Sequence, residues 1–261
     1  MLTSNPFAAI SSSIPATVMQ VYVVIMIALV VAGTLFDIVH KGSARYFFEH
    51  WRRSKGRGAT QIGAGELASI ALKTGLVDVL TSGEFCNARR RFAHLLTMYG
   101  FLIYVITTAV MVFSYPTPET PTPAALPLLW WIGGSMICIG GYWFWFFIRV
   151  DVAAEGNSPL SVTRADLFIL SLLVSVTLGL IWAYMQSSGA SGATVWFGLY
   201  TIATTVLFGS VPWSKFAHMF FKPAAAFEKR VSDANGFRSN LPAPADQPEQ
   251  FGSARELPRH Y

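Results

Sequence analysis

Two of the five histidines, His94 and His218, fall within apolar segments of the sequence. An ionisable side chain in such a segment is expected to serve a function, because burying it in lipid is costly. Two imidazoles on facing helices at the same depth can bind a flat macrocycle from both sides, as in a b-type haem held by a helical bundle. The alternative is that each histidine hydrogen-bonds a backbone carbonyl or a lipid headgroup.

Basic residues lie near both histidines, at positions where they can pair with the haem propionates. The residues expected to do so are Arg90, Arg91, Lys215 and Lys222. Gly209 and Ser210, a little over two turns before His218, are small enough to leave room for a porphyrin. His40 follows the first apolar segment and is a substitute ligand, a quinone contact or an interfacial anchor, whereas His50 and His260 are expected to be solvated.

Other common chemistries lack their motifs. The sequence has no G-x-G-x-x-G, no Walker loop, no G-x-S-x-G and no H-E-x-x-H. Cys86 and Cys138 are too few for an iron–sulfur cluster, which normally takes four thiolates. No catalytic residue is therefore assigned.

The elements that must position the two histidines are membrane-spanning helices. Of the 261 residues, 53% are hydrophobic and 13% are charged, compared with about 25% charged in soluble domains. This composition disfavours a soluble enzyme. The apolar residues form five blocks long enough to cross a bilayer as helices, which predicts an all-α bundle of five transmembrane helices. The blocks are Thr17–Ile38, His94–Phe113, Leu126–Phe147, Ala165–Tyr184 and Val195–Phe220.

The basic residues predict the orientation of these helices. All 19 Lys and Arg residues fall in three segments, Lys41–Arg91, Arg149–Arg164 and the chain from Lys215 onward. The positive-inside rule therefore places the N-terminus outside and the C-terminus in the cytoplasm. With this orientation both His94 and His218 lie near the cytoplasmic face.

Three regions are expected along the chain: a short outer arm over 1–16, a membrane domain over 17–222 and a disordered cytoplasmic tail over 223–261. The membrane domain includes a cytoplasmic loop, 39–93. Apolar residues between Gly63 and Gly83 are spaced for an amphipathic helix. This helix either lies on the inner leaflet or covers the cytoplasmic ends of the spans.

Two stretches of the sequence resemble a known family. CNARRRFAHLLTMYGF, which begins at Cys86 and leads to Thr107-Thr108, resembles the second span of the nitrate reductase gamma-like cytochromes. VPWSKFAHMFFKP, which begins at Val211, resembles their fifth span. The likeness is greatest to the membrane subunits of quinone-interacting oxidoreductase and heterodisulfide-reductase-like complexes.

The resemblance implies that electrons pass between a membrane quinone and a cytoplasmic redox partner through b haem, with His94 and His218 as axial ligands. Members with two haems carry further histidines where this chain has Tyr104 and Tyr200, so we expect one haem near the cytoplasmic face. The two tyrosines are expected to bind a quinone or each other, or to pack. Residues expected to line a quinone site are His40, Arg91, Trp213, Lys215, Tyr104 and Tyr200.

The partners follow from the same resemblance. The chain has no iron–sulfur domain, so a separate soluble iron–sulfur or flavin subunit is expected, and no nucleic acid. The short membrane anchors of dissimilatory adenylylsulfate reductase are most similar, which implies a role in sulfur metabolism at the bacterial inner membrane. The chain is then the non-catalytic or quinone-reacting subunit. The alternatives are a haem-free tethering anchor, with or without a quinone site, and a small transporter.

Overall fold

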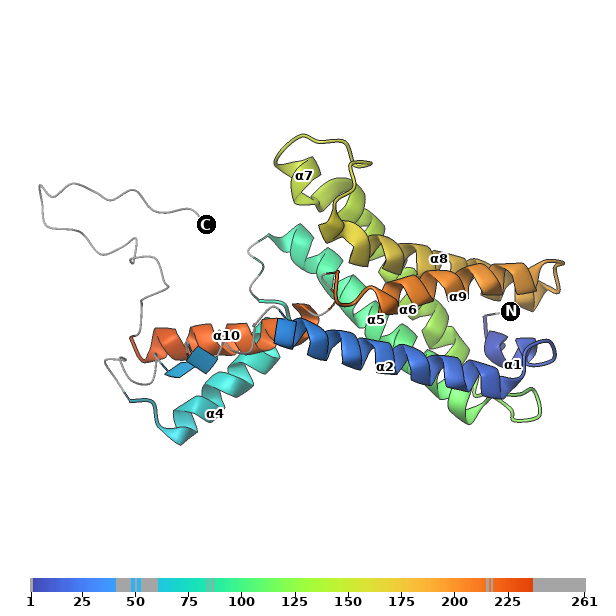
Figure 1. Cartoon of the computed structure of the whole chain (residues 1–261), viewed down its shortest axis with the longest axis horizontal. Coiled ribbons are helices and arrows are strands. Elements are labelled where there is room, and N and C mark those ends of the chain that lie inside the picture. Colours follow the sequence, from blue (N-terminus) through green and yellow to red (C-terminus); the bar gives the residue numbers. More distant parts are fainter. Residues whose placement is uncertain are drawn as a thin grey trace, which may run out of the picture. The chain divides into compact units, whose positions relative to one another are not determined.

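The computed structural model describes residues 2–40, 48–49, 51–52, 61–83, 85, 87–214, 216 and 218–236, and its regular elements are helices throughout this part of the chain (Figure 1). The chain divides into two compact units. Unit 1 comprises Met1–Lys41 and Thr81–Met219, and unit 2 comprises Gly42–Leu80 and Phe220–Tyr261.

Unit 1 contains four helical segments that are long and apolar enough to cross a membrane. The first is α2 (Ala16–His40) and the second is α5 (Ala88–Ser114). The third is α6 (Ala125–Trp143), which continues through the π-helical turn η2 (Phe144–Ile148). The fourth begins with the 3-10 turn η3 (Arg164–Asp166) and continues as α8 (Leu167–Ser188). These segments indicate a helical, multi-pass membrane protein.

The fifth apolar block forms a shorter helix than the sequence predicts. α9 (Ala193–Gly209) has 17 residues and ends before a series of turns at Ser210–Ser214. Pro212 contributes to this break because it lacks a backbone N–H and restricts the residue before it. The predicted span Val195–Phe220 is therefore corrected: His218 is not part of α9 but begins a separate helix, α10 (His218–Ala234).

The helices of unit 1 pack as two antiparallel pairs, α5 with α6 and α8 with α9. α6 also contacts α8, while α2 lies along α9 and α5. Polar side chains join α2 to its neighbours within the apolar region. The Tyr22 hydroxyl donates to the Thr201 carbonyl at 2.9 Å, and the Gln20 amide donates to the Val112 carbonyl at 3.2 Å.

Glycines bring α6 very close to α5. A Cβ atom added to Gly133 would lie 2.9 Å from the Gly100 carbonyl oxygen, and one added to Gly100 would lie 2.7 Å from the Gly133 carbonyl oxygen. Gly134, the next residue, and Gly141, two turns farther along α6, instead face leucine side chains of α8. Small residues are favoured at membrane helix interfaces because they let the backbones approach. α6 therefore uses two faces of glycines to contact two helices.

The N-terminal arm, 1–16, is not only a surface extension. It contains a short helix, α1 (Pro6–Ile10), whose Phe7, Ala8 and Ile10 are buried against α5 and α8. Asn5 caps this helix by accepting from the Phe7 and Ala8 amides, and its own amide donates to the Tyr115 carbonyl at 3.0 Å. α1 therefore closes one end of the bundle.

Unit 2 joins two parts of the chain that were predicted to belong to different regions. The Gly42–Leu80 part of the loop 39–93 groups with the chain from Phe220 onward. The expected amphipathic helix is present as α4 (Ala64–Lys73), which continues as the π-helix η1 (Thr74–Leu80). The expected disordered tail is helical over 223–234, as part of α10; residues 237–261 lie outside the described part.

Candidate functional site

His94 lies in the second turn of α5, and its side chain is exposed. The Asn87 side chain caps the helix by accepting from the amides of Arg89 and Arg90 at 2.9 and 3.2 Å. The Phe85 ring lies near the imidazole, with 5.0 Å between ring centroids. The cap and this ring fix the position of His94 at the start of the helix.

The face of α5 that carries His94 is also the face that meets the segment before His218. Phe101 lies two turns after His94 on the same face, and its ring contacts Phe216 at 6.2 Å. Phe216 is buried, and its ring also contacts Phe168 of α8 at 5.3 Å and Phe208 of α9 at 5.9 Å. His218 follows Phe216 by two residues, at the start of α10.

Space is present beside this aromatic cluster. Among the described residues, no heavy atom beyond its chain neighbours and its own helix backbone lies within 4 Å of a Cβ atom added to Gly209. The neighbouring Ser210 is buried, and its hydroxyl donates to the Leu207 carbonyl at 3.3 Å. A side chain at position 209 would therefore meet no neighbour within 4 Å among the described residues.

The predicted basic residues are not all brought to this site. The Arg90 guanidinium lies over the Phe85 ring at 5.9 Å, beside His94. Arg91 donates from Nε to the Thr81 carbonyl at 2.7 Å, which ties the start of α5 to the chain before it. Lys222 is exposed and belongs to unit 2, and Lys215 lies outside the described residues.

Basic residues at a helix N-terminus are unfavourable because they oppose the helix dipole. Arg89, Arg90 and Arg91 occupy the first turn of α5, and no acidic residue is present in that turn. Such a cluster favours an anionic group nearby, such as a carboxylate or a lipid phosphate. The electrostatics at this end of α5 therefore suit an acidic ligand.

The residues predicted to line a quinone site lie in two separate parts of the structure. Tyr104 lies thirteen residues after Arg91 on the same helix, so the two positions are about 20 Å apart along the helix axis. Trp213, at 74% exposure, and His40, which stacks on Phe36, are exposed. One quinone pocket therefore cannot include both Arg91 and the two tyrosines.

Tyr104 and Tyr200 hydrogen-bond to each other, with 3.3 Å between their hydroxyl oxygens. Trp130 stacks on Tyr104 at 4.7 Å, and Trp182 stacks on Tyr200 at 5.7 Å. All four side chains are buried, and Phe7 of α1 contacts both tryptophans. A Cβ atom added to the facing Gly179 would lie 2.5 Å from the Tyr104 hydroxyl. This part of the bundle is filled by aromatic side chains.

Asp37 lies in the last turn of α2, and it is buried. It lies one turn after Gly33 in α2, and an added Cβ atom at Gly33 would lie 2.9 Å from Val211 and 3.1 Å from Pro212. The end of α2 therefore packs against the segment that carries Trp213. The sequence feature that could have identified Asp37 as a candidate functional residue is a carboxyl group within a long apolar helix.

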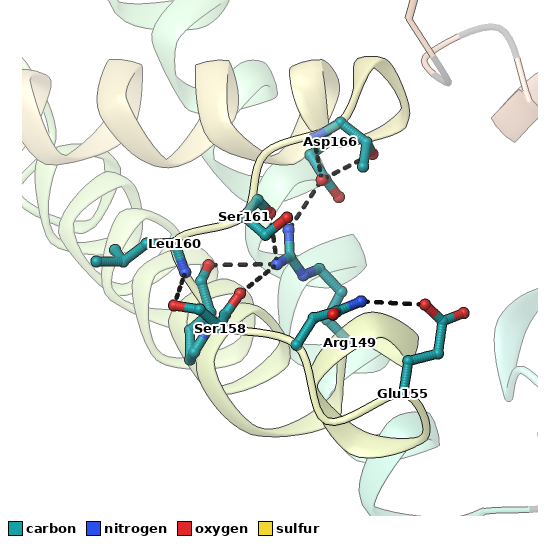
Figure 2. A network of polar contacts seen from close by, with 9 residues as sticks. Arg149, Glu155, Ser158, Leu160, Ser161 and Asp166 are labelled. Carbon is teal, nitrogen blue, oxygen red and sulfur yellow. Dashed lines mark hydrogen bonds and ion pairs between the residues drawn. The ribbon is translucent and has the colours of Figure 1, made fainter.

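Sequence reasoning also missed a network around Arg149, between α6 and α8 (Figure 2). Arg149 is 3% exposed and precedes a one-turn helix, α7 (Val150–Ala153). Its Nη1 donates to Asp166 at 2.8 Å, and its Nη2 donates to the Ser161 carbonyl at 2.7 Å. The guanidinium also lies 3.9 Å from the Trp145 ring. An arginine and an aspartate at the facing ends of consecutive spans were the signal that could have predicted it.

Comparisons with protein-family models, with curated proteins and with solved structures found no match to this chain.

Proposed function

We propose that the chain is the membrane subunit of a bacterial oxidoreductase complex and links a soluble iron–sulfur or flavin subunit to the quinone pool through one b-type haem. The observation that carries this proposal is the contact between Phe101 and Phe216. It brings the His94 face of α5 to the segment that leads to His218. The resemblance of both stretches to the nitrate reductase gamma-like cytochromes supports the same pairing.

The residues near His94 suit a haem. The His94 imidazole is exposed on its helix face, and Gly209 has open space among the described residues. His94 and His218 would hold the iron, and Arg90 and Arg91 would pair with the propionates. A bound b haem supplies a one-electron carrier, and its potential depends on the axial ligands and the nearby charges. Nearby arginines favour the reduced state and so raise the potential.

The aromatic cluster around Tyr104 and Tyr200 supports one haem rather than two. The resemblance places the second ligand pair at these positions, where the two hydroxyls bond to each other at 3.3 Å. The close approach of Tyr104 to Gly179 leaves no space for a macrocycle between them. The open surroundings of Gly209 and the close packing at Gly179 are consistent with a single haem at the His94 end.

The orientation belongs to the same proposal. α9 is apolar, and its 17 residues extend about 26 Å, close to the roughly 30 Å of a bilayer core. With α9 as the fifth span, the segments that link α5 to α6 and α8 to α9 contain no Lys or Arg. We therefore place these two links and the N-terminus outside, and unit 2 in the cytoplasm.

We place quinone chemistry near the end of α2, which packs on the segment that leads to His218. Trp213 is exposed there, and the buried Asp37 belongs to the helix end that packs on the Trp213 segment. Reduction of a quinone consumes two protons as well as two electrons, so a carboxyl group next to the site has a role. We propose that Asp37 delivers a proton to quinone at this end of the bundle.

The haem is tested by a dithionite-reduced minus oxidised spectrum of the purified protein, with haem measured per polypeptide. We expect a b-type spectrum and about one haem per chain, since the proposal provides one pair of axial imidazoles, His94 and His218. His94→Ala and His218→Ala are each expected to abolish the haem without removing the protein from the membrane. His40→Ala is the matched control, because His40 is an exposed histidine at the end of α2, and it should keep the haem.

Three results contradict the proposal in different ways. Full haem content in both ligand variants would exclude the proposed ligands. About two haems per chain would contradict the assignment of the tyrosine cluster as filled space. A folded wild-type protein without haem would favour the tethering anchor, in which the partner's own cluster reduces the quinone.

The implied partner is a soluble redox enzyme such as adenylylsulfate reductase, which oxidises sulfite with AMP. It is tested by adding candidate partners, each with its own substrate, to the reduced-minus-oxidised assay in proteoliposomes that contain a quinone. The correct partner should reduce the haem of the wild-type protein. With the His94→Ala variant, the same partner should no longer reduce the quinone. Quinone reduction at the wild-type rate in that variant would remove the haem from the electron path.

A further inference from the structure

The helix formed by α4 and η1 exposes three leucines on one side, although two of its polar side chains are turned inward on another. Thr74 is buried, and the Asp78 side chain is 8% exposed. In contrast, Leu72, Leu76 and Leu80 are 64%, 50% and 46% exposed. Large exposed apolar patches usually mark an interaction site. The three exposed leucines are therefore expected to contact another surface.

The geometry of η1 places the three leucines on one face. A π-helix has i to i+5 hydrogen bonds and winds more slowly than an α-helix, so residues four apart stay close to one line. Leu72, Leu76 and Leu80 follow this spacing and form what we call the leucine face. Thr74 and Asp78 follow the same spacing on another side of the helix.

The polar side is held by α10 within unit 2. The Arg230 guanidinium binds the Asp78 carboxylate through two bonds, one from Nε to Oδ2 and one from Nη2 to Oδ1 at 2.7 Å. This bidentate pair neutralises the acidic group and fixes the rotation of the helix. The leucine face is therefore directed away from the residues that bind Asp78.

Chain continuity favours the bilayer as the cover. The loop that contains α4 and η1 follows α2 and precedes α5, and both of these helices are candidate membrane spans. Tethering at both ends keeps the effective concentration of the membrane surface high for this helix. A helix with an apolar face and a polar face is suited to lie in the membrane interface.

Charge complementarity favours the same cover. Unit 2 contains 12 Lys and Arg residues and 8 Asp and Glu residues in its sequence. Lys73, next to Leu72, is exposed. Anionic headgroups attract such basic segments by about 1 kcal/mol per Lys or Arg near the surface.

We propose that the leucine face of α4 and η1 inserts into the anionic bilayer surface on the side of the membrane where unit 2 lies. The bond between Asp78 and Arg230 sets the rotation that presents the leucines to lipid. This inference does not depend on the haem, because it uses only unit 2 and the presence of membrane spans.

The test uses the full-length protein in nanodiscs that contain anionic lipid. Cys86 and Cys138 are replaced by Ser, and a single cysteine is introduced and spin-labelled at Leu76, at Leu80 or, as the control, at the exposed Glu66 of α4. Collision of the label with a water-soluble nickel chelate and with oxygen is then measured. For Leu76→Cys and Leu80→Cys, we expect nickel accessibility at least about tenfold below that of Glu66→Cys, because a polar chelate is excluded from apolar surroundings, and higher oxygen accessibility.

Two results would overturn the proposal. Nickel accessibility equal to that at Glu66 would show that the leucine face lies in water. Low accessibility to both nickel and oxygen would show that protein covers it, either a partner or a second copy of the chain. Because the leucines are exposed, their replacement should leave the fold intact. Leu72→Cys reports on the same face if either variant does not fold.

Discussion

Single residues show how this protein places charge at the ends of apolar helices. Arg149 is buried beside Trp145, and it binds Asp166 and three backbone carbonyls, those of Ser158, Pro159 and Ser161. The Asp166 carboxylate also accepts from the amide and hydroxyl of Thr163 at 2.9 Å. Both charges are therefore compensated, which makes burial tolerable. The network fixes the link between α6 and α8.

Replacing one member of this pair should cost more than replacing both. Arg149→Met leaves a buried carboxylate without its counter-charge, and we expect a loss of about 3–5 kcal/mol in the free energy of unfolding. Arg149→Met combined with Asp166→Asn removes both charges and should recover part of that loss. Denaturant unfolding in mild detergent measures both variants. Equal destabilisation by the single and the double variant would contradict this coupling.

At the scale of elements, the contact between α5 and α6 depends on backbone approach rather than on interlocking side chains. The Gly100 and Gly133 carbonyl oxygens each lie within 2.9 Å of the position that a Cβ atom on the other glycine would take. Gly134, one residue farther, faces the end of the Leu180 side chain, which can move. A methyl group added at Gly133 would therefore disturb the helix packing more than one added at the adjacent Gly134.

This difference predicts an order of stability among three alanine variants. Gly133→Ala should lower the melting temperature most, because backbone atoms of α5 must move to admit the methyl group. Gly134→Ala should have a smaller effect, since a leucine side chain can rotate. Gly198→Ala is the control: no neighbouring heavy atom lies within 4 Å among the described residues, so only its helix propensity changes. A fluorescence melt in detergent gives the order, and a Gly134 variant less stable than the Gly133 variant would contradict it.

Across the whole molecule, the chain builds two units that are discontinuous in sequence. Unit 1 contains the apolar helices, and unit 2 joins part of the first long loop to the segment after Met219. Among the described residues of unit 2, Arg230 binds Asp78, and Trp51 stacks on Phe227 at 5.7 Å. The hydrogen bonds from Arg230 lower the pKa of Asp78 below its ordinary range, and burial opposes this shift.

The sign of this pKa shift predicts how unit 2 responds to pH. A lowered pKa in the folded state stabilises the fold above the ordinary aspartate pKa of about 4, and this contribution is lost as the pH falls through the folded pKa. Hydrogen exchange along α10 should therefore be constant from neutral pH down to about 4, after correction for intrinsic rates, and increase below it. Asp78→Asn should increase exchange in α10 already at neutral pH.

Unit 1 supplies the internal control for this experiment. Exchange in α5 and α8, and the haem content if haem is bound, should not change in Asp78→Asn, because Asp78 belongs to unit 2. Unchanged α10 exchange in this variant would show that the pair does not hold α10. Increased exchange throughout both units would show that the variant unfolds the protein as a whole.

The sequence by itself determined which segments are helical and apolar. Length and hydropathy place α2, α6 and α8 within four residues of their predicted limits, because lipid permits backbone polar groups to bond only within a helix or a closed barrel. α5 begins six residues before its predicted start. The spacing of apolar residues likewise predicted the helix over α4 and η1. Histidine positions in the sequence suggested a pair, without showing which helix faces meet.

Only the tertiary structure decided the contacts between segments that are distant in sequence. It separated His218 from α9, placed Tyr104 against Tyr200, buried Arg149 against Asp166 and left the leucine face exposed. Hydropathy averages over a window and is insensitive to one turn or to the rotation of a helix. The end of a helix and its rotation depend on close packing at particular glycines and on paired polar groups. Each of these contacts involves a second segment, whose position the sequence does not give.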